Sequence, residues 1–412
     1  GVLDLDALRL ALVEIVTRHD VLRSCFPDRE GQPFVKVLPV DSFRLLVGDP
    51  IDPAGIPAEV EQESAHDFDL AREGAFRARL VPAGVDDHLL IINMHHIVSD
   101  GWSLGLFARE FAQQFAAVCR GFPATLRALP VTYRDYAHWQ REVLGARVFP
   151  RQLDYWDMRL RGAPAVLDLP VDFPRPAVLE GSGASTSFEI EASIADRLRL
   201  VALEEGATPY MVLLASFYVL LFRFSEQRDI VVGSPVAGRV RPELHDLIGL
   251  FVNTLVLRAE VSPEMSFREL IRTVKRVVLE AQSNQDVPFD QLVDRLQPLR
   301  SMSHSPLFQV MFLLGRGSNE APAQWPGMSV SQVRREVTTS KFDLTLSLDE
   351  NGTGLDGAIE YNTSLFRRDT IDRLAKTYVR LLAGLVAGLD DALGRVPLLD
   401  GDERARLTHA WN

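Results

Sequence analysis

The feature that most constrains the fold is the alternation of strand-like and helix-like segments on both sides of a proline-rich break. Segments 76–81 and 87–94 have the apolar character of strands, and 104–118 then carries apolar side chains at helical spacing. In the second half, strand-like segments at 229–233 and 252–258 again alternate with helical ones. Such alternation is typical of α/β layers. We therefore expect an α/β fold, with a two-layer α+β-type sandwich in each half.

The break is the segment 167–180, which holds three prolines within seven residues. Proline lacks a main-chain N–H and does not continue a helix or a central strand. We therefore place a linker at 167–180, between an N-terminal half, 1–166, and a C-terminal half, 181–398. Residues 399–412 form a tail beyond the second half.

Composition excludes several classes of protein. The chain of 412 residues has a formal net charge of −12, which argues against a nucleic-acid partner, because phosphates require a basic face. Its two cysteines cannot form a disulfide framework, so we expect a reducing, cytoplasmic location. No apolar run approaches the roughly 20 residues of a membrane span, and no signal peptide is visible. We therefore expect no membrane partner.

One segment, 95–103, carries the residue types that catalysis uses. It places His95, His96 and Asp100 between a strand-like and a helix-like segment, and α/β proteins form sites at such junctions. Because successive side chains of a strand point to opposite faces, only one of the two histidines can face a substrate. The strand pattern predicts that His96 shares a face with Met94, opposite His95.

The residues alone leave other roles open for this segment. A histidine in a core-like strand is most often a hydrogen-bonded structural residue. Histidine and aspartate also bind metals, but adjacent strand histidines diverge and no Glu-x-x-His or Cys-x-x-Cys is present, so we expect no metal. A serine nucleophile would require a Gly-x-Ser-x-Gly order that the chain lacks. Gly101 permits a tight turn after Asp100.

The segment 95–103 resembles the His-His-x-x-x-Asp-Gly signature of nonribosomal peptide synthetase condensation domains. Other segments resemble further motifs of that family, in the family's order: 18–23, Tyr155-Trp156, 248–255, 285–293, 304–310 and 361–366. The resemblance covers nearly the whole chain, and so many ordered motifs make it specific. The family's first motif is missing, and the tail 399–412 resembles the linker to an adenylation domain, so we expect a piece of a modular synthetase.

The resemblance implies two chloramphenicol-acetyltransferase-like halves arranged as a V-shaped pseudo-dimer, with a tunnel that reaches His96 from both sides. A donor acyl or peptidyl thioester on the 4′-phosphopantetheine of an upstream carrier protein enters one end. An aminoacyl thioester on a downstream acceptor carrier protein enters the other, and its amine attacks the donor carbonyl to form an amide. The implied partners are these two carriers and a neighbouring adenylation domain, and the domain itself is expected to bind no cofactor.

The resemblance also implies roles for individual residues. His96 is the catalytic candidate, as a base, as a holder of the amine or as a stabiliser of the tetrahedral intermediate, and the sequence does not separate these roles. Gly101 offers a main-chain N–H near the developing oxyanion. Asp100 resembles a structural residue that pairs with an arginine in a bidentate manner, with Arg239 as the first candidate and Arg23 as the second.

Five further side chains are expected to support or line this site. His95 forms its hydrogen bonds inside the protein, and Trp102 is a core residue or a loop anchor rather than a stacking partner of the substrate. Asn253 either bonds within the domain junction or occupies a buried ladder position. Met94 and Asp343 are candidates for the tunnel wall.

Other functions remain open at this stage. The chain could be a catalytically silent relative that recruits a partner enzyme, although His96 and Gly101 are both intact. It could be an epimerization domain, although segment 251–254 fits condensation domains better. A cyclization domain would carry Asp in place of His95, and free-standing acyltransferases lack the series of ordered motifs.

Overall fold

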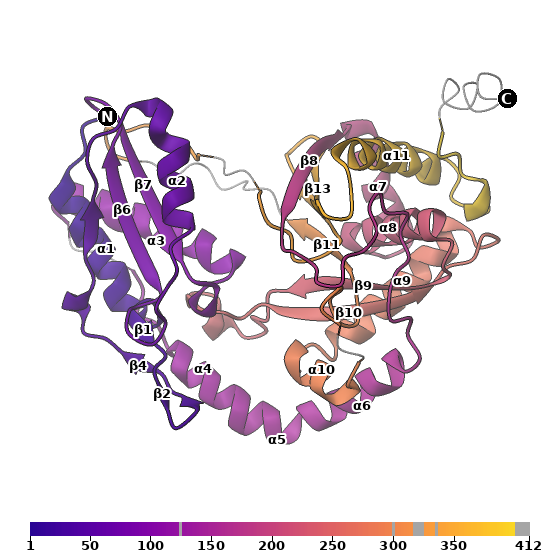
Figure 1. The fold of residues 1–412 in the computed structure, drawn as a ribbon, viewed down its shortest axis with the longest axis horizontal. Helices are drawn as coiled ribbons and strands as arrows, with labels where there is room; N and C mark the ends of the chain where they lie inside the picture. The colour runs from indigo at the N-terminus through magenta and orange to yellow at the C-terminus, as the bar shows by residue number, and fades with distance from the viewer. Residues whose placement is uncertain (123–125, 299–300, 316–324, 334–336, 400–412) are drawn as a thin grey trace. The chain divides into compact units, whose positions relative to one another are not determined.

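The fold is that of a computed structural model (Figure 1). It describes residues 1–122, 126–298, 301–315, 325–333 and 337–399. Its contacts divide the chain into two units, each described here by itself. The first consists of Gly1–Ala146, Ala237–Val252 and Glu320–Arg335, and the second of Arg147–Val236, Asn253–Asn319 and Glu336–Asn412.

These units differ from the predicted halves in three segments. The segment 147–166, predicted in the N-terminal half, belongs to the second unit, whereas 237–252 and 320–335, predicted in the C-terminal half, belong to the first. The segment 237–252 leaves the second half of the sequence and packs in the first unit. The predicted linker 167–180 packs on the second unit, where the Leu167 N–H donates to the side chain of Gln309 at 2.7 Å and Leu167 is buried. Its prolines keep this segment out of helices and β-ladders, but main-chain N–H groups of its other residues still form hydrogen bonds with the second unit. From residue 400 on, the predicted tail lies outside the described residues.

The first unit is built on a three-stranded sheet of order β5-β6-β7, with β5 parallel and β7 antiparallel to the central β6. The strands are β5 (Leu45–Val47), β6 (Phe76–Pro82) and β7 (His88–Met94). Although the segment that forms β7 is strongly apolar, it lies at the end of this order. Phe76 pairs with Met94, so the start of β6 and the end of β7 lie at the same end of the sheet.

Helices cover both faces of this sheet. Apolar residues of α1 (Leu5–Arg18) and α3 (Gly101–Cys119) form the core with β6 on one face. On the other face, Glu63 at the end of α2 (Ile56–Ser64) binds the Arg77 guanidinium, with 2.7 Å between Oε1 and Nε. α1 begins where the side chain of Asp4 accepts a hydrogen bond from the Ala7 N–H, as an N-cap does.

Short elements complete the first unit. The segment 32–38 forms two two-residue strands rather than one continuous strand. Pro33 lacks the N–H that a continuous ladder would need. The short elements are η1 (Asp20–Arg23), β1 (Ser24–Cys25), β2 (Asp28–Arg29), β3 (Gln32–Pro33), β4 (Lys36–Val37), η2 (Val40–Ser42), η3 (Pro53–Gly55), η4 (His96–Val98) and η6 (Pro242–Leu244). After α3 the chain forms α4 (Tyr133–Trp139), the π-helix η5 (Gln140–Leu144) and α5 (Gly145–Arg147).

The second unit has a six-stranded mixed sheet of order β10-β9-β11-β12-β13-β8, in which β11 is parallel to both of its neighbours and the other pairs are antiparallel. Its strands are β8 (Gly183–Ile190), β9 (Asp229–Val236), β10 (Asn253–Glu260), β11 (Val310–Gly315), β12 (Leu344–Glu350) and β13 (Leu355–Asn362). Four helices pack on one face of this sheet and form the larger hydrophobic core (Figure 1). They are α7 (Ala192–Glu204), α8 (Pro209–Ser225), α9 (Phe267–Gln282) and α11 (Arg368–Ala387).

The remaining elements of the second unit are α6 (Phe149–Leu160), α10 (Phe289–Leu296) and η7 (Leu393–Arg395). Among the described helices none alone has the length and hydrophobicity of a membrane span, although α7 and α8 together, with a bend of 108°, pass on length and composition. Each unit layers helices on a sheet, so the predicted α/β class is confirmed.

Candidate active site

The turn after β7 presents the two adjacent histidines. β7 ends at Met94, and the main-chain N–H of His95 donates to the carbonyl of Ala75 at 2.9 Å. The His95 side chain then caps the short η4 helix, because its Nδ1 accepts the Ile97 N–H at 3.0 Å. His95 is half-buried and its ring lies edge-on to that of Phe68. It therefore holds the turn in place.

His96 is the first residue of η4, and its side chain is exposed. The prediction that strand alternation places it on one face with Met94 is wrong, because the strand ends before either histidine. Its Nδ1 lies 2.6 Å from the carbonyl oxygen of Ser99. A carbonyl only accepts, so Nδ1 carries the proton and Nε2 of the neutral ring keeps its lone pair. The exposed imidazole is thus oriented as a proton acceptor.

Asp100 lies four residues further on in a different environment. It is the N-cap of α3 and its side chain is 3% exposed. Its Oδ1 accepts from both the N–H and the hydroxyl of Ser103, each at 2.8 Å. Its Oδ2 accepts from the N–H groups of Phe251 and Val252 at 3.0 and 3.2 Å. The carboxylate therefore ties α3 to the segment 237–252 and does not orient His96.

Arg239 is the arginine that pairs with Asp100. Its Nη2 lies 3.3 Å from Oδ1 of Asp100 and 2.9 Å from the hydroxyl of Ser103. Its Nη1 donates to the carbonyls of Leu244 and Leu247 at 2.6 and 2.7 Å. Burial lowers the pKa of Arg239 from its usual range, and the charge of Asp100 opposes that shift. The pair makes one contact rather than the expected bidentate one, because the second guanidinium nitrogen holds its own loop.

Trp102 stands beside this pair at the surface. Its indole Nε1 donates to the carbonyl of His245 at 3.0 Å, and its ring centre is 5.7 Å from the guanidinium carbon of Arg239. The residue is 47% exposed and so is not part of the core. These contacts agree with the expectation that Trp102 anchors the loop.

Gly101 begins α3, and its main chain is not left-handed. A Cβ built at this position would meet no heavy atom within 4 Å. The turn therefore accepts glycine, as expected, but does not require it. The Gly101 N–H belongs to the first helical turn, where main-chain donors lack intrahelical acceptors.

Arg23, the second candidate partner of Asp100, does not reach it. Its guanidinium donates to the carbonyls of Val16 and Leu38 at 3.3 and 2.6 Å. Met94, a candidate for the tunnel wall, is half-buried and packs against the core of the first unit.

Asp343 and Asn253 belong to the second unit. Both carboxylate oxygens of Asp343 accept from Arg175, and its side chain is 2% exposed. Asp343 is thus not supported as a tunnel residue, because it forms a buried ion pair. Asn253 starts β10 opposite Val236, and its amide bridges to the carbonyls of 285 and 287 and to the N–H of 289.

A buried network that sequence reasoning missed links α1, α3 and the segment 237–252. His19 Nε2 lies 2.7 Å from Oε2 of Glu110, and its Nδ1 accepts the Ile248 N–H at 3.4 Å. Arg18 Nε lies 3.1 Å from the same carboxylate oxygen. Burial would raise the pKa of Glu110, but His19 and Arg18 together hold it below its usual value. The available signal was a charged residue on the otherwise apolar face of the 104–118 helix.

Metal ligands are not gathered anywhere in the described part of the chain, where no group of three or more His, Cys, Asp or Glu side chains could hold an ion. The site therefore has an exposed imidazole four residues before a buried carboxylate that pairs with a guanidinium, with no candidate metal centre among the described residues.

Known proteins are similar to this chain over nearly its whole length. A family described as "Condensation domain" matches residues 1–408. The chain is 40% identical over 423 residues to one of the linear gramicidin synthase polypeptides of Brevibacillus parabrevis, a match that covers 100% of this chain and 8% of that protein. It is also 40% identical over 407 residues to the phosphinothricin tripeptide synthetase PhsC of Streptomyces viridochromogenes, covering 97% of this chain and 37% of that protein. The chain therefore spans well under half the length of either relative.

Solved structures share the fold. The X-domain from teicoplanin biosynthesis superposes with a TM-score of 0.89 at 25% identity, covering 97% of this chain and 91% of that one. The first condensation domain of the CDA synthetase superposes with a TM-score of 0.78 at 22% identity, covering 97% and 92%.

Proposed function

The chain belongs to the condensation-domain family of nonribosomal peptide synthetases, and from that premise we propose that it joins a donor acyl or peptidyl thioester to the amine of an acceptor aminoacyl thioester. The resemblance inferred from the ordered motifs is thereby confirmed. Membership in this family implies amide-bond-forming acyltransferase activity in general. The particular reaction, its substrates and its partners are the proposal.

The observation that carries the proposal is the orientation of His96. The Ser99 carbonyl fixes the proton on Nδ1, so the exposed Nε2 is free to accept one. When the amine adds to the thioester carbonyl, its nitrogen must lose a proton before the intermediate collapses to the amide. The thiolate that leaves then takes up a proton. A base in that position contributes about 10²- to 10⁴-fold to the rate.

The chemistry demands little more of the protein. An α-amine has a pKa near 8, so roughly a tenth is already unprotonated at pH 7. The thioester is an activated acyl group, and holding the two reactants together supplies much of the acceleration. Asp100 plays no part as the orienting member of a hydrolase-like triad, because its oxygens bind Ser103, Phe251 and Val252.

Gly101 has two properties that suit the same reaction. Its N–H lies in the first turn of α3, where it offers a donor to a developing oxyanion. Its open side leaves space that any side chain would reduce. We assign Gly101 to the substrate space for these two reasons.

The partners in this proposal are an upstream donor carrier, a downstream acceptor carrier and a neighbouring adenylation domain. The substrates arrive on the carriers' 4′-phosphopantetheine, and the domain holds no cofactor of its own. The V-shaped arrangement of the halves, the tunnel and the cytoplasmic location remain predictions. Nothing in the site favours the recruitment platform or the epimerization reaction over amide formation.

Intact-protein mass spectrometry tests the proposal directly. Donor and acceptor carriers, loaded in turn with each proteinogenic amino acid, are mixed with the domain, and amide formation raises the mass of the acceptor carrier by the donor acyl group. Tethered acceptors should react faster than free amino acids at equal sub-millimolar concentrations, because the tether raises effective concentration. Equal rates would point to a free-standing acyltransferase. No product from any pair, with carriers still bound, would support the recruitment platform.

A further inference from the structure

The loop between α2 and β6, residues 65–75, lies against the histidine turn at two points. The carbonyl of Ala75 accepts the N–H of His95 at 2.9 Å. The half-buried ring of Phe68 stands edge-on to the ring of His95, with 5.9 Å between the ring centres and 79° between the planes. The first contact holds the main chain of His95, and the second meets its side chain.

The His95 ring caps η4 only in one orientation. Its Nδ1 accepts the N–H of Ile97 at 3.0 Å, and a half-turn of the imidazole would remove this acceptor. The outer torsion of a histidine side chain is broad and roughly two-fold, so the rotamer alone does not select the capping orientation. A second ring packed edge-on against the imidazole restricts its rotation. Phe68 supplies this contact.

Phe68 is held in turn by its own loop. The ring of His66 also stands edge-on to that of Phe68, at 4.9 Å and 79°. Oε1 of Glu73 lies 3.2 Å from Nε2 of His66, and because a carboxylate only accepts, this nitrogen carries the proton. The same Oε1 accepts the N–H of Asp69 at 2.8 Å. Glu73 therefore closes the loop on both sides of Phe68 in the sequence.

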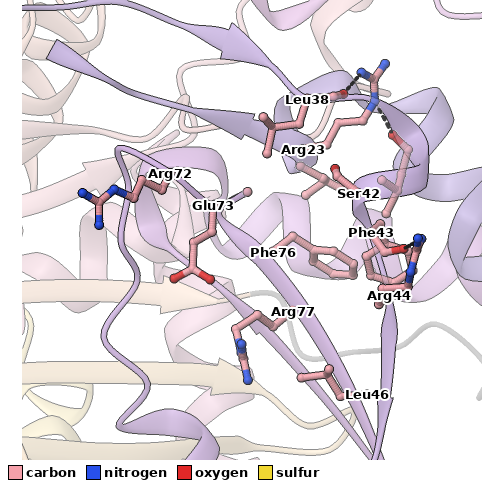
Figure 2. A pocket seen from close by; sticks show the side chains of 13 residues that line it. Arg23, Leu38, Ser42, Phe43, Arg44, Leu46, Arg72, Glu73, Phe76 and Arg77 are labelled. Carbon is pink, nitrogen blue, oxygen red and sulfur yellow. Dashed lines mark hydrogen bonds between the residues drawn. The ribbon is translucent and has the colours of Figure 1, made fainter.

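Part of this loop borders a cavity. The cavity has a volume of about 290 Å³, and its lining includes Arg72, Glu73 and Gly74 of the loop. Figure 2 shows Arg72 and Glu73 at one side of this space. A loop that borders open space is not held by packing on that side, so its shape depends on its own hydrogen bonds.

We propose that Phe68 is a positioning residue of this domain. Its ring holds the ring of His95, His95 caps η4, and η4 carries His96. Glu73 and His66 take part by holding Phe68. The contact between Phe68 and His95 does not depend on what the protein does, whereas its effect on a rate rests on the proposed function.

Hydrogen exchange of main-chain amides, measured by mass spectrometry with single-residue fragmentation, tests the contact without an activity assay. In Phe68→Leu the amide of Ile97 should exchange roughly fivefold faster or more, because its acceptor is free to rotate away. Phe68→Tyr keeps the ring and should exchange like the wild type. Phe34→Leu, a change in an exposed phenylalanine of the same unit, should do the same.

Two results of this measurement would overturn the proposal. One is wild-type exchange at Ile97 in a folded Phe68→Leu protein. The other is equally faster exchange throughout α3, which would show a general loosening of the unit rather than the loss of one cap.

The single-turnover rate tests the link to the reaction. Phe68→Leu should lower the rate by roughly three- to tenfold at saturating carriers and leave the carrier concentration for half-maximal rate unchanged. Phe68→Tyr should restore the rate. Adding Phe68→Leu to His95→Ala should change the rate no further, because Phe68 acts through the His95 ring. Losses that multiply in the double variant would show that Phe68 acts by another route and would contradict the proposal.

Circular dichroism gives the folded fraction of each variant, by which its rate is divided. If Phe68→Leu does not fold, Glu73→Ala at a half-buried position of the loop provides the comparison. It should also speed exchange at Ile97, and wild-type exchange there would count against the proposal. If the wild-type chain forms no amide, the proposed function fails, while hydrogen exchange still decides whether Phe68 holds the turn.

Discussion

His96 and Asp100 lie four residues apart in one segment and occupy opposite environments. The His96 ring is exposed, with one nitrogen on a carbonyl and the other open. The Asp100 carboxylate is buried, with its oxygens bound to Ser103, Arg239 and the N–H groups of 251 and 252. The difference teaches that one motif can provide a reacting group at one position and a structural tie at another.

Burial determines which of the two residues is structural and which is free to react. A carboxylate removed from water is stable only when paired and hydrogen-bonded, and each partner it gains reduces what it can offer a substrate. An exposed imidazole needs no such compensation. The two residues should therefore fail differently when they are changed.

The largest effect is expected for His96→Ala. Single-turnover amide formation should fall by about 10²- to 10⁴-fold, because no group replaces Nε2 as proton acceptor. The melting temperature should stay that of the wild type, since the side chain is exposed. His88→Ala, which changes an exposed histidine of β7, is the matched control. A near-wild-type rate in His96→Ala would leave His96 with positioning alone.

Asp100→Ala should act on stability. It leaves Arg239 buried without its carboxylate and three N–H groups without acceptors, so unfolding should become easier by about 3–5 kcal/mol. Urea unfolding measures the change. Adding Arg239→Met should restore part of the loss, because no unpaired charge then remains buried. A single variant as stable as the wild type would show that the pair does not hold the fold.

Glu110→Gln should change how stability depends on pH. The pKa of Glu110 is lower in the folded protein than its ordinary value of 4.5. Its contribution to stability is therefore complete above pH 4.5 and is lost as the pH falls through the folded pKa. The wild type should lose more unfolding free energy on acidification than Glu110→Gln does. Glu14→Gln, at an exposed position of α1, should follow the wild type, and parallel curves for all three proteins would refute the assignment.

The smallest effect is expected for His95→Ala. The variant loses the side-chain cap of η4 and the edge contact with Phe68, so unfolding should become easier by about 1 kcal/mol. The rate should fall less than in His96→Ala, since the turn loses one of its supports and keeps its proton acceptor. A rate as low as that of His96→Ala in a folded His95→Ala protein would assign the chemistry to both histidines.

The sequence was sufficient to predict the α/β class, the position of 95–103 between a strand and a helix, and Arg239 as the partner of Asp100. It was insufficient for the directions of the histidines, because the end of a strand is set by hydrogen bonds such as that from His95 to Ala75. The return of 237–252 to the first unit could not be predicted, since no local pattern marks a long-range crossing. Glu110 was missed because its partners come from distant segments.

The most direct measurement is the single-turnover rate of Asp100→Asn, divided by the fraction of protein that circular dichroism shows to be folded at the assay temperature. Asparagine keeps the shape of the side chain but places N–H groups or a weaker acceptor where the carboxylate accepted hydrogen bonds, so less protein should be folded. Per folded molecule the rate should remain within a few-fold of the wild type, whereas that of His96→Ala should not. A fully folded Asp100→Asn protein without activity would contradict the division of this segment into a reacting histidine and a structural aspartate.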